Sequence, residues 1–164
     1  MGLTFDTGAL IALERRDLRM RKVLDTALAG RVAITVPTAV VAEWWRGRSA
    51  RLDGMLAMFT IEDMTERLAK LAGEAMAAVT SATVVDAIVM ASAASRGDPV
   101  YTSDVGDLAR LRDGRFPTVR VLAVRNRDSH PDNPESGGRR RSGPRTAAGR
   151  YASELARCLL ERRP

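Results

Sequence analysis

The 164-residue chain contains almost no cysteine or histidine. Because Cys158 is its only cysteine, no disulfide can form within the chain. With His130 as its only histidine, a zinc site built from nitrogen and sulfur ligands is also excluded. A histidine-dependent ribonuclease mechanism is excluded for the globular part, since His130 lies in a segment with the composition of a linker. These absences favour a reducing, cytoplasmic setting.

Lysine is scarce as well, and Lys22 and Lys70 are the only two. A phosphoacceptor receiver domain needs an acid pair after its first strand and a lysine after a late strand, and neither lysine has that position. A haloacid dehalogenase-like phosphatase needs a second aspartate two residues after Asp6, where this chain has Gly8. Both classes are therefore excluded.

Long apolar runs are also missing. The residues after Met1 do not form a basic leader, so we expect no secretion signal. Residues 75–95 hold a single acid but are rich in Ala, Ser and Thr, a pattern that predicts two buried helical pieces rather than a membrane span. We therefore expect no contact with a membrane.

The composition divides the chain into parts. Hydrophobic residues make up 45% of it, which suffices for the core of one domain. Residues 1–124 carry 16 basic and 15 acidic side chains, against 10 and 5 in residues 125–164. We predict a globular domain over 1–124, a disordered basic linker over 125–150 and a short helical tail over 151–164. The arginines of the linker are either RNA-phosphate contacts or a solvated tail.

Short β-rich runs alternate with helical patterns along residues 1–124. This alternation predicts an α/β fold with three layers, in which helices flank a central, mainly parallel sheet. The expected strands are 3–5, 32–36, 60–62, 100–102 and 119–124, and the expected helices are 8–15, 18–29, 38–45, 49–59, 64–79, 83–95 and 104–112.

Four segments each hold a lone acid and no base. Asp6, Glu43 and Asp86 are each the only charge in a long apolar stretch, and Asp104 follows a short β-rich run, with Asp107 three residues later. Burying a carboxylate without a partner costs free energy. A neighbouring cation, protonation or a bound metal ion offsets that cost.

The expected topology brings these acids together. Asp6 and Asp104 follow strands, and ligands of open parallel sheets bind at the carboxyl ends of the strands. Carboxylates and water are the ligands that Mg²⁺ and Mn²⁺ prefer. The matching reaction is phosphodiester hydrolysis, in which the ion activates water and neutralises phosphate charge.

For most of these acids, a purely structural role is the alternative to a functional one. Asp6 and Asp104 are suitable N-caps for the helices that follow them. Asp86 and Asp107 are placed to complement a helix dipole in a first turn. Glu43 sits late in its helix and has no such alternative.

The segments that carry the acids resemble those of the PIN domain family. They are residues 3–10 (LTFDTGAL), 40–43 (VVAE), 85–91 (VDAIVMA) and 101–108 (YTSDVGDL). Their order and spacing are similar to those of VapC toxins from bacterial toxin–antitoxin pairs, over about residues 1–124.

The resemblance implies a PIN-like fold, Mg²⁺- or Mn²⁺-dependent cleavage of RNA, a homodimer, and inhibition by a VapB-like antitoxin. It implies that Asp6, Glu43, Asp86 and Asp104 form the catalytic quartet, with Asp107 as a further metal ligand beside Asp6, Asp86 and Asp104. Thr7 and Thr102 would orient the carboxylates. The alternative is a catalytically inactive PIN-like scaffold that binds RNA or a protein partner.

Two adjacent tryptophans, Trp44 and Trp45, follow Glu43. Successive helical positions point about 100° apart, so the two rings cannot both face the core. We predict that one ring stays near Glu43 and contacts the antitoxin.

Overall fold

A computed structural model describes the chain apart from residues 46, 48–49 and 125–164. Its five strands form one sheet in which every neighbouring pair is parallel, in the order β3-β2-β1-β4-β5. The strands are β1 (Leu3–Phe5), β2 (Ile34–Pro37), β3 (Thr60–Glu62), β4 (Val100–Thr102) and β5 (Val121–Ala123).

Seven helices connect the strands in the described part of the chain. Side chains cap several of their N-termini, as the Ser, Thr and Asp residues before apolar runs predict. The helices are α1 (Thr7–Glu14), α2 (Leu18–Ala29), α3 (Thr38–Trp44), α4 (Ala50–Leu56), α5 (Glu66–Ala78), α6 (Val84–Arg96) and α7 (Val105–Gly114).

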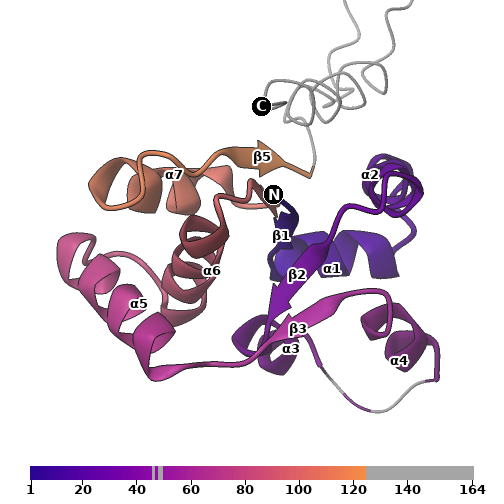
Figure 1. Cartoon of the computed structure of the whole chain (residues 1–164), viewed down its shortest axis with the longest axis horizontal. Coiled ribbons are helices and arrows are strands. Elements are labelled where there is room, and N and C mark those ends of the chain that lie inside the picture. The colour runs from indigo at the N-terminus through magenta and orange to yellow at the C-terminus, as the bar shows by residue number, and fades with distance from the viewer. Residues whose placement is uncertain (46, 48–49, 125–164) are drawn as a thin grey trace, which may run out of the picture.

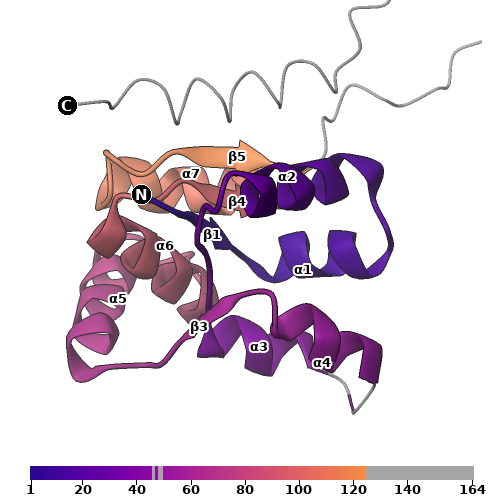
Figure 2. The same cartoon turned by 45° about the vertical axis from the view of Figure 1, so that its right-hand side comes forward.

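The helices cover both faces of the sheet (Figures 1 and 2). Helix α6 packs against β1, β2 and β4, with α5 outside it, and α7 packs against β5 and α6. Helices α1 and α2 lie on the other side of the sheet, where α1 contacts β1 and β4. This is the three-layer α/β fold that the sequence predicts.

The core is centred on β1, the middle strand. Phe5 is fully buried, and its ring makes edge-on contacts with Phe59 and Tyr101, each at a centroid distance of 5.8 Å. These rings join the loop after α4 and strand β4 to the middle of the sheet. The residue that follows Phe5 is thereby fixed at the carboxyl edge.

Most expected elements are confirmed, and the boundaries of several are corrected. Strand β2 begins at Ile34 because the N–H of Val32 donates to Ala27 of helix α2 at 2.8 Å. It also includes Pro37 as its last residue. The last strand is shorter than 119–124, since the N–H of Val119 closes a turn onto Phe116.

The fourth helix is likewise shorter than the expected 49–59. It ends at Leu56 because the chain then tightens into turns with hydrogen bonds three residues apart. The N–H of Met58 donates to the carbonyl of Met55 at 3.2 Å, and the N–H of Phe59 donates to that of Leu56 at 3.0 Å. The expected linker (125–150) and helical tail (151–164) lie outside the described residues. Within the described part, no helix has the length and hydropathy that crossing a membrane would require.

Candidate active site

The order of the strands reverses at the centre of the sheet. The chain runs outward from β1 through β2 to β3, returns through α5 and α6 to β4 beside β1, and continues to β5. Ligands of such sheets bind outside the carboxyl ends of the strands where this reversal occurs. Asp6 follows β1 and Asp104 lies two residues after β4, so both occupy this position.

Asp6 is held by the backbone and by a neighbouring hydroxyl. Its Oδ1 accepts a hydrogen bond from the N–H of Ala9 at 2.7 Å, which caps α1. The hydroxyl of Thr102, at the end of β4, also donates to its side chain. Because both donors belong to regular elements, the carboxylate has a fixed orientation at the carboxyl edge.

Burial controls the ionisation of Asp6, of which only 8% is exposed. Loss of water disfavours the charged form. Burial therefore raises the pKa of Asp6 to about 6, with repulsion from Asp86 adding to the effect, although the bonds from Thr102 and Ala9 oppose it. At neutral pH Asp6 is a buried anion, and none of the ion pairs among the described residues includes it.

The loops after β1 and β4 approach each other closely beside Asp6. A Cβ atom built on Gly8 would lie 2.0 Å from Oγ and 2.9 Å from the backbone nitrogen of Ser103. Any side chain at position 8 would push the two loops apart. Gly8 thus allows the first turn of α1 to contact the segment between Thr102 and Asp104.

Asp86 reaches the same edge from the first turn of α6. Helix α6 leads into the start of β4, so its N-terminus lies toward the opposite, carboxyl edge of the sheet. The N–H of Asp86 donates to Oγ1 of Thr83 at 3.1 Å, and the Thr83 hydroxyl donates back to Oδ2 of Asp86 at 2.7 Å. This reciprocal cap orients the carboxylate.

Three other acids raise the pKa of Asp86, and Asp86 in turn raises the pKa of Asp6. Burial is the largest cause that raises the pKa of Asp86, and repulsion from Asp107, Glu43 and Asp104 raises it further. Repulsion from Asp86 likewise raises the pKa of Asp6. We call these five residues, Asp6, Glu43, Asp86, Asp104 and Asp107, the acidic edge.

Glu43 and Asp104 have hydroxyl or backbone partners. The Thr7 hydroxyl donates to Oε2 of Glu43. Asp104 caps α7 by accepting from the N–H of Asp107 at 3.2 Å, while its own N–H donates to Oγ1 of Thr102 at 2.8 Å. Thr7 and Thr102 therefore contact acids of the edge.

Asp107 differs from the other members because it has a cation. Arg110 donates to Oδ1 of Asp107 and also reaches Oγ of Ser81, at 3.2 Å from its Nε. Asp6, Glu43, Asp86 and Asp104 form no ion pair within the described residues. Asp107 is therefore partly neutralised.

The chemistry of the acidic edge suits a hard divalent cation. Its donors are carboxylate oxygens whose mutual repulsion raises two pKa values, and a bound cation would relieve that repulsion. In the part of the chain that the structure describes, however, no three acidic, histidine or cysteine side chains stand close enough to hold a metal ion as they are. An ion would have to draw these carboxylates together.

The structural alternatives for these residues are present alongside the cluster. Asp6 and Asp104 are indeed N-caps, and Asp86 and Asp107 are first-turn acids. Sequence reasoning missed Thr83 as the partner of Asp86, although the spacing T-x-x-D before an apolar helix could have revealed it.

The two tryptophans do diverge, as their adjacent positions require. Trp44 is buried, and its Nε1 donates to Oε2 of Glu14 at 3.1 Å. Trp45 is half-buried and packs edge-on against Trp44, at a centroid distance of 6.1 Å. A contact between Trp45 and an antitoxin stays a prediction.

These features define an α/β protein with a cluster of carboxylates at the reversal point of a parallel sheet. The chain belongs to the PIN domain family, whose model matches residues 3–114. PIN domains are generally nucleases. No curated protein is a significant match to the chain.

Solved structures with the same fold come from bacterial toxin–antitoxin complexes. VapBC2 from Rickettsia felis, bound to a promoter DNA fragment, matches with a TM-score of 0.60 and 15% identity over 75% of this chain and 98% of its own. DNA-bound VapBC from Salmonella typhimurium matches with 0.61 and 16% over the same shares. A toxin–antitoxin complex from Klebsiella pneumoniae gives 0.53 and 20%, over 72% and 95%. At these identities the likeness shows the fold.

Proposed function

We propose that this protein is a metal-dependent endoribonuclease and the toxin of a VapBC-type toxin–antitoxin pair. The observation that carries the proposal is the pair of carboxylates Asp6 and Asp86 at the carboxyl edge. Burial raises the pKa of both, and repulsion from other acids of the edge raises each pKa further. Perturbed carboxylates without cationic partners are typical of functional sites.

Each acid would have a defined part in holding Mg²⁺ or Mn²⁺. Asp6, Asp86 and Asp104 would bind the ion, with Asp107 joining once it leaves Arg110, and Glu43 would complete the catalytic quartet. When bound, the ion neutralises charge on the scissile phosphate and lowers the pKa of water. Thr102, Thr83 and Thr7 keep the carboxylates oriented for this task.

The acidity of Asp6 makes cation binding dependent on pH. Protons and cations compete for a carboxylate whose pKa is about 6. We therefore expect cation affinity to be highest above pH 7 and to fall as the pH decreases through 6.

The proposed partners are an RNA substrate, a VapB-like antitoxin and a second copy of this chain. The solved VapBC and toxin–antitoxin structures share its fold over nearly their whole length, which supports an antitoxin partner. The homodimer follows from the family resemblance, and light scattering of the purified chain measures it.

The test is cleavage of a total RNA preparation by the purified full chain, with Mg²⁺, with Mn²⁺ and with excess chelator. We expect cleavage that needs one of the two ions. Asp6→Asn and Asp86→Asn should each reduce it by more than about a hundredfold, because each removes a charged ligand. Near wild-type cleavage by either variant would overturn the assignment.

Asp113→Asn is the matched control for these variants. Asp113 is an exposed acid near the other end of α7 from Asp104, and it pairs with its neighbour Arg112. The substitution removes the same charge from the protein without touching the acidic edge. It should leave cleavage unchanged.

The second candidate function is an inactive scaffold that binds RNA or a protein. It is favoured by the lack, among the described residues, of three ligands already placed for a metal ion. Calorimetric titration with Mn²⁺ separates the two candidates. Saturable binding that Asp86→Asn abolishes supports the enzyme, and no binding together with retained RNA affinity supports the scaffold.

A further inference from the structure

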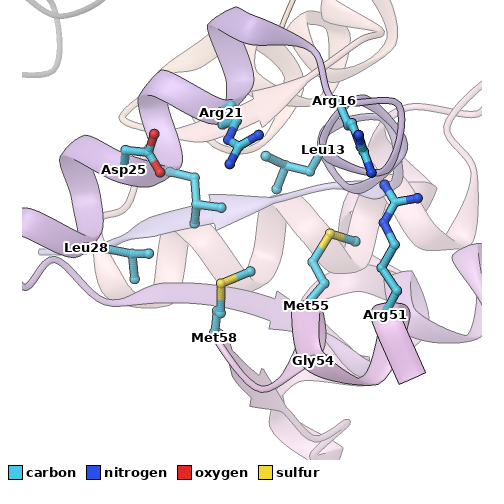
Figure 3. Close-up of a pocket in the computed structure, with 10 residues that line it drawn as sticks. Leu13, Arg16, Arg21, Asp25, Leu28, Arg51, Gly54, Met55 and Met58 are labelled. Carbon is cyan, nitrogen blue, oxygen red and sulfur yellow. The ribbon is translucent and has the colours of Figure 1, made fainter. Parts of the chain in front are cut away.

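A groove that shares no lining residue with the acidic edge has no role in the proposed reaction. It has a volume of about 670 Å³ and lies between α2 and α4 (Figure 3). Its apolar lining comes from α1, α2, α4 and the turn after α4. These residues are Leu13, Leu24, Leu28, Met55 and Met58, and we call this surface the α2–α4 groove.

Two large apolar side chains of the groove are well exposed. Leu28 is 44% exposed and Met58 is 40% exposed, and the two side chains face the hollow from opposite walls. Flexible methionines suit a surface that adapts to an apolar side chain. The rim is basic, with Arg16, Arg21 and Arg51 against the single acid Asp25.

We propose that residues 151–162 of this same chain dock as an amphipathic helix in the α2–α4 groove. All large apolar side chains beyond Val124 fall within this segment, while residues 125–150 contain none. A helix of this length is marginal in water and needs an apolar partner surface.

The pattern of the segment matches the groove in shape and charge. At 3.6 residues per turn, Tyr151, Leu155, Cys158 and Leu159 form one apolar stripe. Glu154 and Glu161, seven residues apart, flank that stripe on the same side. They would face a rim that carries three arginines.

The connection between the domain and the segment is long enough for docking within one chain. The described chain ends after β5, on the side of the molecule where α2 lies (Figures 1 and 2). Residues 125–150 follow, and a flexible chain of this length spans roughly 28 Å on average. Such a tether gives an effective concentration on the order of millimolar, so a weak contact suffices for docking.

The single cysteine allows a direct test in the full chain, because Cys158 lies on the proposed contact stripe. The rate at which its thiol reacts with a chromogenic disulfide reagent is measured in buffer and in concentrated guanidinium chloride. We expect about fivefold slower reaction in buffer, set by the fraction of undocked segments. A rate in buffer equal to that of the denatured chain would overturn the proposal.

Two methionines of equal exposure provide a matched pair of variants. Met58→Asp places a charge inside the groove and should raise the thiol rate in buffer to within about twofold of the unprotected rate. Met64→Asp places it outside the groove, on a residue that is 42% exposed against 40% for Met58, and should leave protection intact. Protection that survives Met58→Asp would show that the segment docks elsewhere.

Leu155→Asp tests the segment itself without touching the described domain. It should also abolish protection, although a carboxylate one turn before Cys158 by itself slows thiolate reaction. An unchanged rate for this variant would count against the proposal. Dilution completes the test, because docking within one chain is independent of protein concentration. Protection that weakens on dilution would assign the groove to the segment of a second copy instead.

Discussion

Two groups of carboxylates in this small domain, each with one buried member, have opposite kinds of partner. Asp98 is 2% exposed and Asp6 is 8% exposed, so both have left water almost completely. Asp98 accepts from Nε of Arg96 at 2.9 Å and from the N–H of Gly2 at 2.5 Å. The donors to Asp6 among the described residues are neutral, namely the N–H groups of Ala9 and Gly8 and the hydroxyl of Thr102.

The guanidinium of Arg96 organises the first group. It donates to Oε1 of Glu62 at 2.5 Å, to Oγ1 of Thr4 at 3.0 Å and to Oγ of Ser92 at 2.8 Å, besides its contact with Asp98. This Arg96 cluster joins the ends of α6 and β3 to strand β1. A buried charge whose partners are complete supports the fold, whereas the acidic edge keeps its negative charge available for a ligand.

The largest effect on stability is expected for Arg96→Met. The substitution leaves Asp98 and Glu62 without their cation, and breaking a buried pair by removing one partner costs about 3 kcal/mol. Urea unfolding of the full chain measures this loss.

Arg112→Met is the control for Arg96→Met, because Arg112 also pairs with an aspartate but is a surface residue. Surface ion pairs of this kind contribute little. Equal losses for the two variants would remove the distinction between the two kinds of pair.

The second prediction concerns Asp6→Asn, which should stabilise the protein at pH 7.5 when divalent cations are absent. Folding raises the pKa of Asp6 from 3.8 to about 6. The stability that the protonated carboxyl provides is therefore fully present below pH 3.8 and is lost as the pH rises through 6. The shift corresponds to about 3 kcal/mol, since one pKa unit is worth 1.36 kcal/mol.

Unfolding of wild type and Asp6→Asn between pH 4 and pH 8 measures this difference, which should shrink toward the acidic end. Asp98→Asn gives the opposite expectation, a loss of stability at pH 7.5, because its charge is used by Arg96. A destabilised Asp6→Asn protein at pH 7.5 would contradict the comparison.

The third prediction compares two threonine N-caps. Thr65 accepts from the N–H of Leu68 at 3.2 Å, and Thr83 accepts from the N–H of Asp86 at 3.1 Å. Replacement of either by alanine should cost about 1 kcal/mol of stability. Of the two variants, only Thr83→Ala should also weaken Mn²⁺ binding, because Thr83 contacts a carboxylate of the acidic edge and Thr65 does not.

Thermal unfolding and a Mn²⁺ titration of both variants test this prediction. Equal Mn²⁺ affinity for the two would show that Thr83 is a helix cap and nothing more.

The smallest effect is expected for removal of residues 125–164. The described domain has a complete core without them, so the shortened chain should fold, lose at most about 1 kcal/mol and retain RNA cleavage. Its affinity for RNA should fall most at low salt, because ten basic side chains leave with the segment. Circular dichroism and RNA binding at two salt concentrations check this outcome, and an unfolded product would refute it.

The sequence alone determined the order of the strands and helices and the identity of the acids. Alternating β-rich and helical patterns predict α/β layers because their periods depend only on local backbone geometry. Asp6 and Asp86 could be selected because each is the sole charge in an apolar run. The boundaries near Val32 and Leu56 could not be predicted, since they depend on single hydrogen bonds to the preceding turns.

Only the tertiary structure decided which acids are free and which are neutralised. Within the acidic edge, Asp107 is paired with Arg110, and outside it the buried Asp98 is paired with Arg96. Asp6 is left with neutral donors because β4 lies beside β1 and brings Thr102 to it. The strength of a charge in a protein depends on burial and on partners distant in sequence, and both are set by how the sheet is assembled.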